Sequence, residues 1–289
     1  EDRRLYSLHL AYGMKPGAIM IDAGVFDGTD WTVAGVLSGA TVLGFEPIAK
    51  NRHLFRQRFP LVLSQESSAA AMAMSSLHQC KFYTMLELTP GEGFPHEKWS
   101  EVFYSQDGCL SEAKAIEGLG HAYVFGAALG EQVRILNMTT RYDYSSVADS
   151  GYLKGPKDMD VEQVAMTTLD IVFDRYLSLG GYRSRTFIDV LKVDVEGYEL
   201  GVLRGAERLL SMGRVHYIMM EFNPGMLGTT GTDPNGLLSF VQYYGFLCHS
   251  FKIDRPLSFE DFVRRYTEDS DMLPMQGLGE LEDLVCENL

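Results

Sequence analysis

The sequence predicts one α/β domain over residues 1–289, with a mostly parallel sheet of about seven strands and helices on both faces. Strands and helices alternate between Ala18 and Phe59, which is the order that builds a parallel sheet. Further along, a strand over Thr186–Asp194 ends in acidic residues and turns directly into a helix. Open α/β sheets hold their chemistry at such strand ends. The 46% of hydrophobic residues allows a substantial core.

The first four elements are the clearest. The apolar run Ala18–Asp22 predicts a strand that leads into a glycine-containing turn, and Trp31–Leu37 has the spacing of a helix. Thr41–Phe45 predicts a second strand and Ala49–Phe59 a second helix. The next segment, residues 61–120, is rich in Ala, Met and turn residues and shows no clear alternation. We expect it to be an insertion that either covers a substrate site as a lid or merely decorates the surface.

The second half continues the strand–helix alternation with two irregularities. A long loop rich in Tyr, Ser, Gly and Asp is expected over 139–160, and two short strands are expected to close the sheet near the end of the chain. The predicted strands are His121–Leu129, Val133–Met138, Gln163–Thr167, Thr186–Asp194, Val215–Phe222, Phe246–Phe251 and Leu284–Glu287, and the predicted helices are Leu169–Leu179, Tyr198–Ser211 and Asn235–Tyr244.

Composition and charge narrow the classes of partner. The net charge of −14 and the lack of a basic patch disfavour nucleic acid as a ligand. No 18-residue apolar run or signal peptide is evident, although the start at Glu1 rather than Met leaves room for an upstream segment. The four cysteines form no CxxC pair, so we expect free thiols and a cytoplasmic location. Asn137-Met138-Thr139 matches the N-glycosylation triplet, a pattern that is common by chance.

The first motif with chemical meaning is the turn from Asp22 to Gly28. Its glycines allow a tight turn and the close approach of a ligand to the backbone. The spacing is GxxxG rather than the GxGxxG of dinucleotide sites, and Asp22 and Asp27 would repel phosphate. The turn therefore suits a positively charged ligand without phosphates, such as S-adenosylmethionine. Glu46 ends the next strand, where an acid can accept hydrogen bonds from ribose hydroxyls.

The second motif groups acids at later strand ends. Asp194 and Glu196 stand two residues apart, so we expect both side chains on the same face of a strand, and Glu221 ends the neighbouring strand. Such carboxylates suit a general base, or Mg²⁺ together with waters. Glu196 has an alternative reading as an acid that stabilises the start of a helix. Whether a metal binds is left open.

Together these motifs resemble the FkbM family of S-adenosylmethionine-dependent methyltransferases. The resemblance covers about residues 18–223 without the insertion, and its most specific part is KVDVEGYE at 192–199 with the following LRGA. IDAGVFDG, FEP, TTLD and IMMEFNP also contribute. It implies the class I methyltransferase fold, in which the last strand of a Rossmann-like sheet is antiparallel. Phe26 departs from the Asn found in many members, and the second proline usual after FEP is missing.

The resemblance also implies roles for particular residues. The cofactor-binding residues would be Asp22, Ala23, Gly24, Phe26, Gly28, Glu46, Ala127, Ala128 and Asp194, and the catalytic residues Asp194, Glu196 and Glu221. We therefore expect an O-methyltransferase acting on a hydroxyl of a sugar or other small metabolite. Two alternatives stay open at this stage. One is a nicotinamide-dependent oxidoreductase, against which the missing GxGxxG argues. The other is a cofactor-binding scaffold that has lost catalysis.

Overall fold

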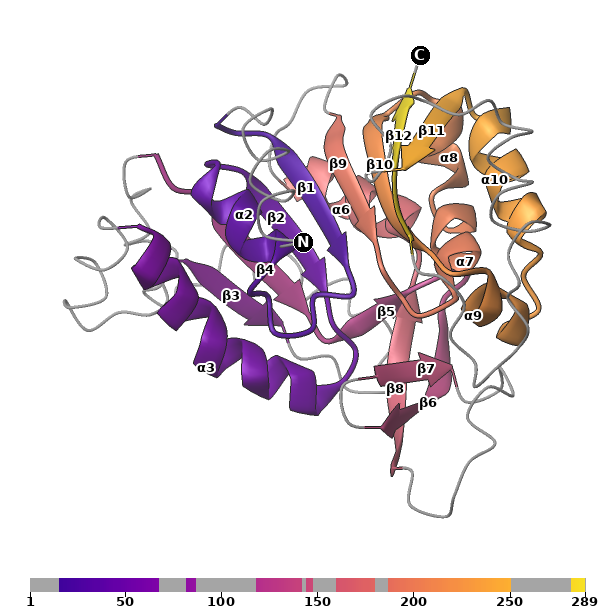
Figure 1. Ribbon diagram of the computed structural model, residues 1–289. Helices are drawn as coiled ribbons and strands as arrows, with labels where there is room; N and C mark the ends of the chain where they lie inside the picture. Colours follow the sequence, from indigo (N-terminus) through magenta and orange to yellow (C-terminus); the bar gives the residue numbers. More distant parts are fainter. Residues whose placement is uncertain are drawn as a thin grey trace. The chain divides into compact units, whose positions relative to one another are not determined.

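The computed structural model of the chain describes residues 16–67, 82–86, 118–141, 144–147, 160–179, 187–250 and 282–288. It is a mixed α/β fold with a large, mostly parallel sheet (Figure 1). The chain divides into two compact units, residues 1–128 with 173–189, and residues 129–172 with 190–289. The single domain expected over residues 1–289 stays a prediction. Most of the expected insertion, 68–81 and 87–117, lies outside the described residues, as does most of the loop expected over 139–160.

The first unit holds four parallel strands in the order β1-β2-β4-β3. They are β1 (Ile19–Ala23), β2 (Thr41–Phe45), β4 (His121–Phe125) and β3 (Tyr83–Leu86). All five residues of β1 are buried, because a strand in the interior of a parallel sheet is covered on both faces. The helices α2 (Trp31–Leu37) and α3 (Ala49–Glu66) belong to this unit.

The strand β3 lies inside the segment that was expected to be an insertion. Its Tyr83 ring meets the stacked rings of Phe55 and Phe59 edge-on, at centroid distances of 5.1 and 5.8 Å. These contacts join β3 to α3, and the register with β4 joins it to the sheet. Residues from within 61–120 are therefore part of the first unit's sheet.

The second unit contains the other four strands of the main sheet, in the order β9-β10-β12-β11. They are β9 (Ile188–Val193, which begins in the first unit), β10 (Val215–Phe222), β12 (Glu282–Asn288) and β11 (Phe246–Ser250). The last strand, β12, runs antiparallel to both β10 and β11, as the class I methyltransferase fold implies. Within the described residues the main sheet has eight strands, so the expected seven-stranded arrangement is not confirmed.

The second unit also holds a smaller antiparallel sheet, in which β6 (Arg134–Arg141) lies between β8 (Asp160–Thr167) and β7 (Tyr144–Val147). The inward residues of β6 and β8 are buried and apolar. The extended piece predicted over 163–167 is confirmed as part of β8, and all but the first residue of the piece predicted over 133–138 lies in β6. The loop expected over 139–160 is wrong for 139–141 and 144–147, which are strand residues of β6 and β7. The helices of this unit are α7 (Glu199–Arg204), α8 (Glu207–Ser211), α9 (Pro224–Thr229) and α10 (Pro234–Tyr243), and α6 (Leu169–Leu179) begins in it.

Two predicted elements are broken where a glycine stands. The strand expected over His121–Leu129 is interrupted at Gly126, so that β4 is followed by the separate short strand β5 (Ala127–Leu129). The helix expected over Tyr198–Ser211 is interrupted at Gly205, where a Cβ atom would strike the backbone carbonyl oxygen of Gly130. A larger residue at 205 has no room, which explains why a glycine stands between the two helices.

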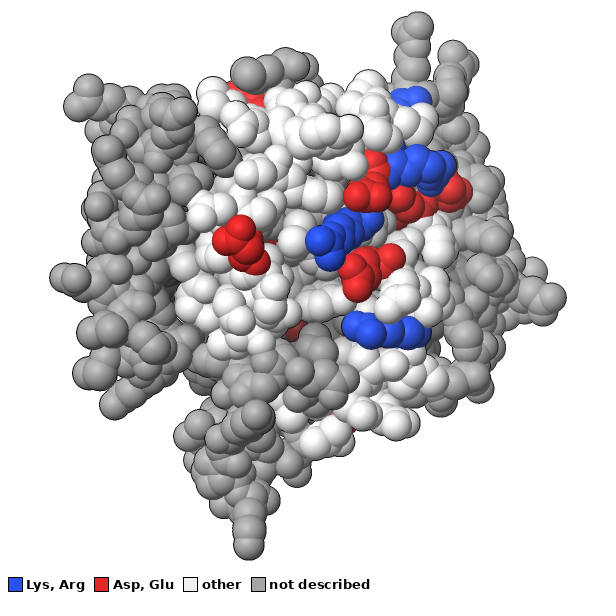
Figure 2. Space-filling model, turned by 90° about the vertical axis from the view of Figure 1, so that its right-hand side faces the viewer, with Lys and Arg blue, Asp and Glu red and all other residues white. Residues whose placement is uncertain are grey.

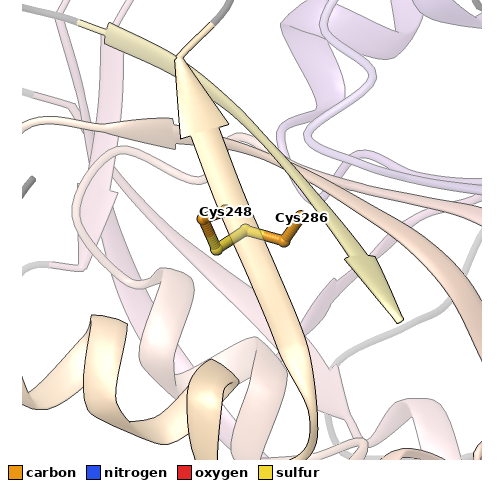
Figure 3. Close-up of a disulfide and its surroundings, with 2 residues drawn as sticks. All are labelled: Cys248 and Cys286. Carbon is orange, nitrogen blue, oxygen red and sulfur yellow. A yellow bond between two sulfur atoms is a disulfide. The ribbon is translucent and has the colours of Figure 1, made fainter. Parts of the chain in front are cut away.

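A disulfide between Cys248 and Cys286 joins β11 to β12 (Figure 3). The two residues stand directly opposite each other in the antiparallel register, with their Cα atoms 3.9 Å apart. The expectation of free thiols is therefore wrong for this pair, because strand pairing brings together cysteines that are 38 residues apart in the sequence. Cys80 and Cys109 lie outside the described residues.

Two surface properties bear on partners. On the face shown in Figure 2, acidic and basic side chains lie beside each other rather than separating into patches of one sign. The ion pair between Arg204 and Glu131, at 3.5 Å, is one exposed example in the second unit. None of the described helices is long and apolar enough to cross a membrane.

Candidate active site

The turn after β1 is held at the end of β2 within the first unit. Asp22 is almost fully buried, and its Oδ2 accepts a hydrogen bond of 2.5 Å from the hydroxyl of Thr32 at the start of α2. The backbone N–H groups of Gly24 and Val25 both donate to the carbonyl of Phe45. Gly24 adopts φ of +87°, which its lack of a Cβ atom permits. Asp22 thus helps to fix the turn as well as being a candidate ligand for a cofactor.

Phe26 adopts the left-handed conformation, with φ of +54°. In the described part of the chain, Phe26 and Glu196 are the non-glycine residues with positive φ, and both lie in the turns singled out by the sequence motifs. Such a conformation costs roughly 1–2 kcal/mol for a residue with a Cβ atom and is often found at functional sites. Asn tolerates this conformation better than Phe, so Phe26 is an unusual residue for this position.

Glu46 joins the end of β2 to the glycine turn. Its carboxylate accepts hydrogen bonds from the N–H groups of Phe26 (2.9 Å) and Ile48 (2.8 Å) and from the side-chain amide of Asn51 (3.3 Å). Burial raises the pKa of Glu46 to about 7, and these hydrogen bonds lower it only in part. A carboxylate has about four acceptor positions, so about one is left for a ribose hydroxyl. The three hydrogen bonds that Glu46 already accepts therefore leave room for one ribose hydroxyl rather than for both.

Gly28 and Asp27 have roles in packing. A Cβ atom at Gly28 would strike the ring of Phe55 on α3, so a glycine is needed there whether or not a ligand binds. Asp27 forms an ion pair of 2.8 Å with Arg58 on the same helix and accepts hydrogen bonds from Thr29. The negative charge of Asp27 is therefore already paired. Ala127 and Ala128 lie in β5 rather than at the end of β4, and Ala127 is fully buried.

Three carboxylates gather in the second unit. Asp194 and Glu196 follow β9, Glu221 lies near the end of β10, and one oxygen of each lies within 4.8 Å of the others. The prediction that these residues come together is confirmed. The expected cause is wrong, because β9 ends at Val193 and Glu196 sits in a left-handed turn, with φ of +56°, rather than on the face of a strand.

The charge of Asp194 has a buried partner. The ammonium group of Lys192 lies 3.7 Å from Asp194 Oδ2, and only 6% of the Lys192 side chain is exposed. A carboxylate is a group that can accept a proton as a general base. The cluster can therefore hold a proton taken from an acceptor, or offer oxygen ligands to a divalent cation.

Glu199 is a buried residue of this motif to which the sequence analysis gave no role. Its Oε1 accepts hydrogen bonds from the N–H groups of Gly197 (3.0 Å) and Val195 (3.3 Å), which fixes the turn that carries Glu196. Its Oε2 is buried and has no hydrogen bond within the described residues. Burial, followed by the nearby charge of Asp194, raises the pKa of Glu199 to about 7. The sequence signal was an acid five residues after Asp194 at the first position of a helix.

The helix α9 holds the same turn from the other side. The hydroxyl of Thr230 donates to the carbonyl of Gly197 at 2.6 Å, and a Cβ atom at Gly197 would lie 2.6 Å from the carbonyl oxygen of Met226. Asn223, which follows β10, caps α9 by accepting from the N–H of Met226. One short helix thus connects the turn that carries Glu196 with the strand that carries Glu221.

The motifs TTLD and LRGAERLL meet in the structure and stabilise each other. The two carboxylate oxygens of Asp170 accept hydrogen bonds from the N–H groups of Arg208 (3.0 Å) and Leu209 (3.1 Å) in α8. The N–H of Asp170 in turn donates to the carbonyl of Gly205 at 2.9 Å. Both motifs therefore have a structural role, because they pack the start of α6 against the start of α8.

Replacing Glu199 by glutamine is expected to weaken the dependence of stability on pH. With a folded pKa near 7 against an ordinary value of 4.5, the folded chain binds this proton more tightly than the unfolded chain. The free energy of unfolding therefore falls as the pH rises from about 4.5 to 7, by about 3 kcal/mol for one such group. Urea unfolding at pH 5 and pH 8 measures this difference, which should shrink in Glu199→Gln and stay unchanged in the exposed control Glu207→Gln. An equal difference in all three proteins would contradict the assignment.

A glycine turn and an acid at adjoining ends of parallel strands are typical of α/β enzymes that bind a nucleoside-containing cofactor. The methyltransferase FkbM domain matches residues 22–248, and the chain therefore belongs to this methyltransferase family. Comparison with curated proteins found no match. The matched range includes the glycine turn and the carboxylate cluster and ends at Cys248, before β12. Methyltransferases in general use S-adenosylmethionine as the methyl donor.

Proposed function

We propose that the chain is an S-adenosylmethionine-dependent O-methyltransferase that acts on a hydroxyl of a sugar or another small metabolite. The family supports methyl transfer. The observation that carries the cofactor assignment is the hydrogen bond from the N–H of Phe26 to Glu46. It joins the glycine turn to the acid at the next strand end, the arrangement with which Rossmann-like enzymes hold an adenosine ribose.

The cofactor-binding residues in this proposal are grouped around the glycine turn and Glu46. Glu46 holds a ribose hydroxyl, and Asp22 contributes negative charge that favours the positively charged cofactor over a phosphate-bearing one. The backbone of the turn offers a surface for close approach. The residues proposed to bind the cofactor are Asp22, Ala23, Gly24, Phe26, Gly28, Glu46, Ala127, Ala128 and Asp194.

The acceptor chemistry in this proposal is assigned to the cluster of Asp194, Glu196 and Glu221. A sugar hydroxyl is a poor nucleophile, so its proton must be removed as the oxygen attacks the methyl carbon of the sulfonium. We assign this step to Asp194, whose Oδ2 lies 3.7 Å from the buried ammonium group of Lys192. Glu196 and Glu221 orient the acceptor hydroxyl through hydrogen bonds, and the three oxygens together suit Mg²⁺ in the presence of waters.

The acceptor in this proposal is a small molecule or a glycan rather than a nucleic acid. The net charge of −14 supports this choice, since binding to phosphate chains is carried by basic residues. The cytoplasmic location expected from the cysteine pattern stays a prediction. The disulfide between Cys248 and Cys286 favours instead a compartment in which disulfides persist.

Binding of S-adenosylmethionine is expected to tighten as the pH rises through about 7, because Glu46 accepts a hydroxyl hydrogen bond best when it is ionised. Calorimetric titrations at pH 6 and pH 8 measure this change. Glu46→Gln should bind about tenfold to a hundredfold more weakly and lose the pH dependence. Glu66→Gln, on the exposed end of α3, serves as the control.

The same titrations separate the competing functions. S-adenosylmethionine and S-adenosylhomocysteine should both bind, and NAD⁺ should not. Binding of NAD⁺ alone would overturn the methyltransferase assignment in favour of an oxidoreductase. Binding of S-adenosylmethionine without turnover on any sugar or small hydroxylated acceptor, with or without Mg²⁺, would identify a scaffold that has lost catalysis.

A further inference from the structure

We infer that Asn137 carries an N-linked glycan. The triplet Asn137-Met138-Thr139 is the sole Asn-x-Ser/Thr sequence in the 289 residues. The sequence alone gives this triplet little weight. Three features of the second unit strengthen the case for a modified residue. They are the exposure of Asn137, its apolar neighbours and the disulfide.

The first feature is the position of Asn137 on the outer face of β6. The side chains on either side of it in the sequence, Leu136 and Met138, point inward and are only 7% and 8% exposed. Asn137 is exposed, and so is Gln163, the residue opposite it on β8. The register of β6 with β7 begins only at Met138, so β7 has no residue paired with Asn137. A bulky group on the Asn137 amide would therefore project from the sheet without displacing packed atoms of the described residues.

The second feature is the apolar surface around that position. Ile135, two residues before Asn137, is 48% exposed, and Val161, which is paired with Thr139, is 60% exposed. Val133, just before β6, is 51% exposed. Neighbouring apolar side chains on an outer sheet face are unfavourable in water and mark a surface that something covers. The first sugars of a glycan on Asn137 would lie beside these side chains and shield them from water.

The third feature is the disulfide between Cys248 and Cys286, which belongs to the main sheet and is independent of β6. Disulfides persist in the oxidising compartments of the secretory route and are rare in the cytosol. N-linked glycans are attached in that same route. A chain that acquires this disulfide there also exposes its single triplet to the glycosylation machinery.

The chemistry is a transfer of a glycan to an amide. The donor is an oligosaccharide linked through a diphosphate to a polyprenyl lipid. The Nδ2 atom of Asn137 attacks the anomeric carbon, a C–N bond forms, and the C–O bond to the diphosphate breaks. The polyprenyl diphosphate leaves, and the amide proton passes to a base of the transferase. Thr139 is only 6% exposed in the folded sheet, so its hydroxyl can be recognised only before β6 and β8 pair.

The test is peptide mass spectrometry of the full chain isolated from the cells that naturally make it. Cleavage after Arg134 and Arg141 releases the peptide ILNMTTR, which contains Asn137. This peptide should carry the mass of a glycan, and treatment with peptide N-glycosidase F should convert position 137 to Asp. Recovery of mostly unmodified ILNMTTR would overturn the inference. A non-reducing digest of the same sample should contain the peptides of Cys248 and Cys286 joined together.

Variants secreted from a eukaryotic cell line test the position itself. The wild-type chain and Thr139→Ser, which keeps the triplet, should both shift in electrophoretic mobility after glycosidase treatment. Asn137→Gln and Thr139→Ala should show no shift. Because Asn137 is exposed, Asn137→Gln should fold like the wild type, so the absence of its shift cannot come from a folding defect. A shift in Asn137→Gln, or none in the wild type, would exclude Asn137 as the acceptor.

Discussion

Replacing Asp194 by asparagine is expected to lower kcat for methyl transfer by about 10²- to 10⁴-fold, the range typical of a lost general base. Asparagine has nearly the same shape as aspartate, but it cannot take up the proton of the acceptor hydroxyl. The affinity for S-adenosylmethionine should change much less than kcat. Single-turnover methylation with a labelled methyl donor measures the chemical step directly.

The control for this variant must separate lost chemistry from lost structure. The substitution leaves the buried Lys192 without its nearby carboxylate, at a cost of about 1–3 kcal/mol in stability. Unfolding should therefore be measured on the same samples. Asp174→Asn, an exposed site on α6, removes an equal charge and should keep wild-type activity. Undiminished turnover in Asp194→Asn would show that Asp194 is not the base.

Replacing Gly197 by alanine is expected to lower the free energy of unfolding by about 2–4 kcal/mol and to abolish most activity. Gly197 has φ of +93°, which an L residue adopts only at a cost, and a Cβ atom would lie 2.6 Å from the carbonyl oxygen of Met226. That oxygen belongs to the backbone of α9 and cannot simply rotate away. The turn must move, and Glu196 moves with it.

A second glycine isolates the cost of the backbone conformation alone. Gly213 has φ of +60°, but no atom lies within 4 Å of where its Cβ would stand. Gly213→Ala should therefore lose only about 1 kcal/mol, and its activity should stay intact. Urea unfolding of both variants gives the comparison. Equal losses would mean that the contact with Met226 is unimportant.

The order of strands and helices could be predicted because it depends on local patterns. Strand and helix periodicities are visible within a few residues, and α2 and β2 have the predicted bounds. The helix α9 could not be found in this way. It has six residues, two of them glycine, and it forms because Pro224 and the Asn223 cap start it. Six residues are too few for the helical repeat of apolar residues to be recognised in the sequence.

The three carboxylates were expected to lie together and do so, but the structural reason given for it was wrong. Alternation along a strand placed Asp194 and Glu196 together in the prediction, whereas the structure does so through the left-handed conformation of Glu196. That conformation is imposed by Glu199 and by Thr230, which is more than 30 residues away in the sequence. Likewise, the four cysteines allow several pairings, and only the register of β11 with β12 selects Cys248 and Cys286. Long-range contacts of this kind leave no local pattern.

The position of β12 affects the time at which the second unit can fold during synthesis. β12 comprises residues 282–288, yet it lies between β10 and β11, which the ribosome makes much earlier. Both neighbours pair with it through antiparallel ladders, so until it arrives β10 and β11 have exposed edges where β12 will pair. Exposed strand edges during synthesis favour aggregation. A chain cut short before residue 282 lacks β12 and cannot close this sheet, so we expect it to depend on chaperones in a way that a chain containing β12 does not.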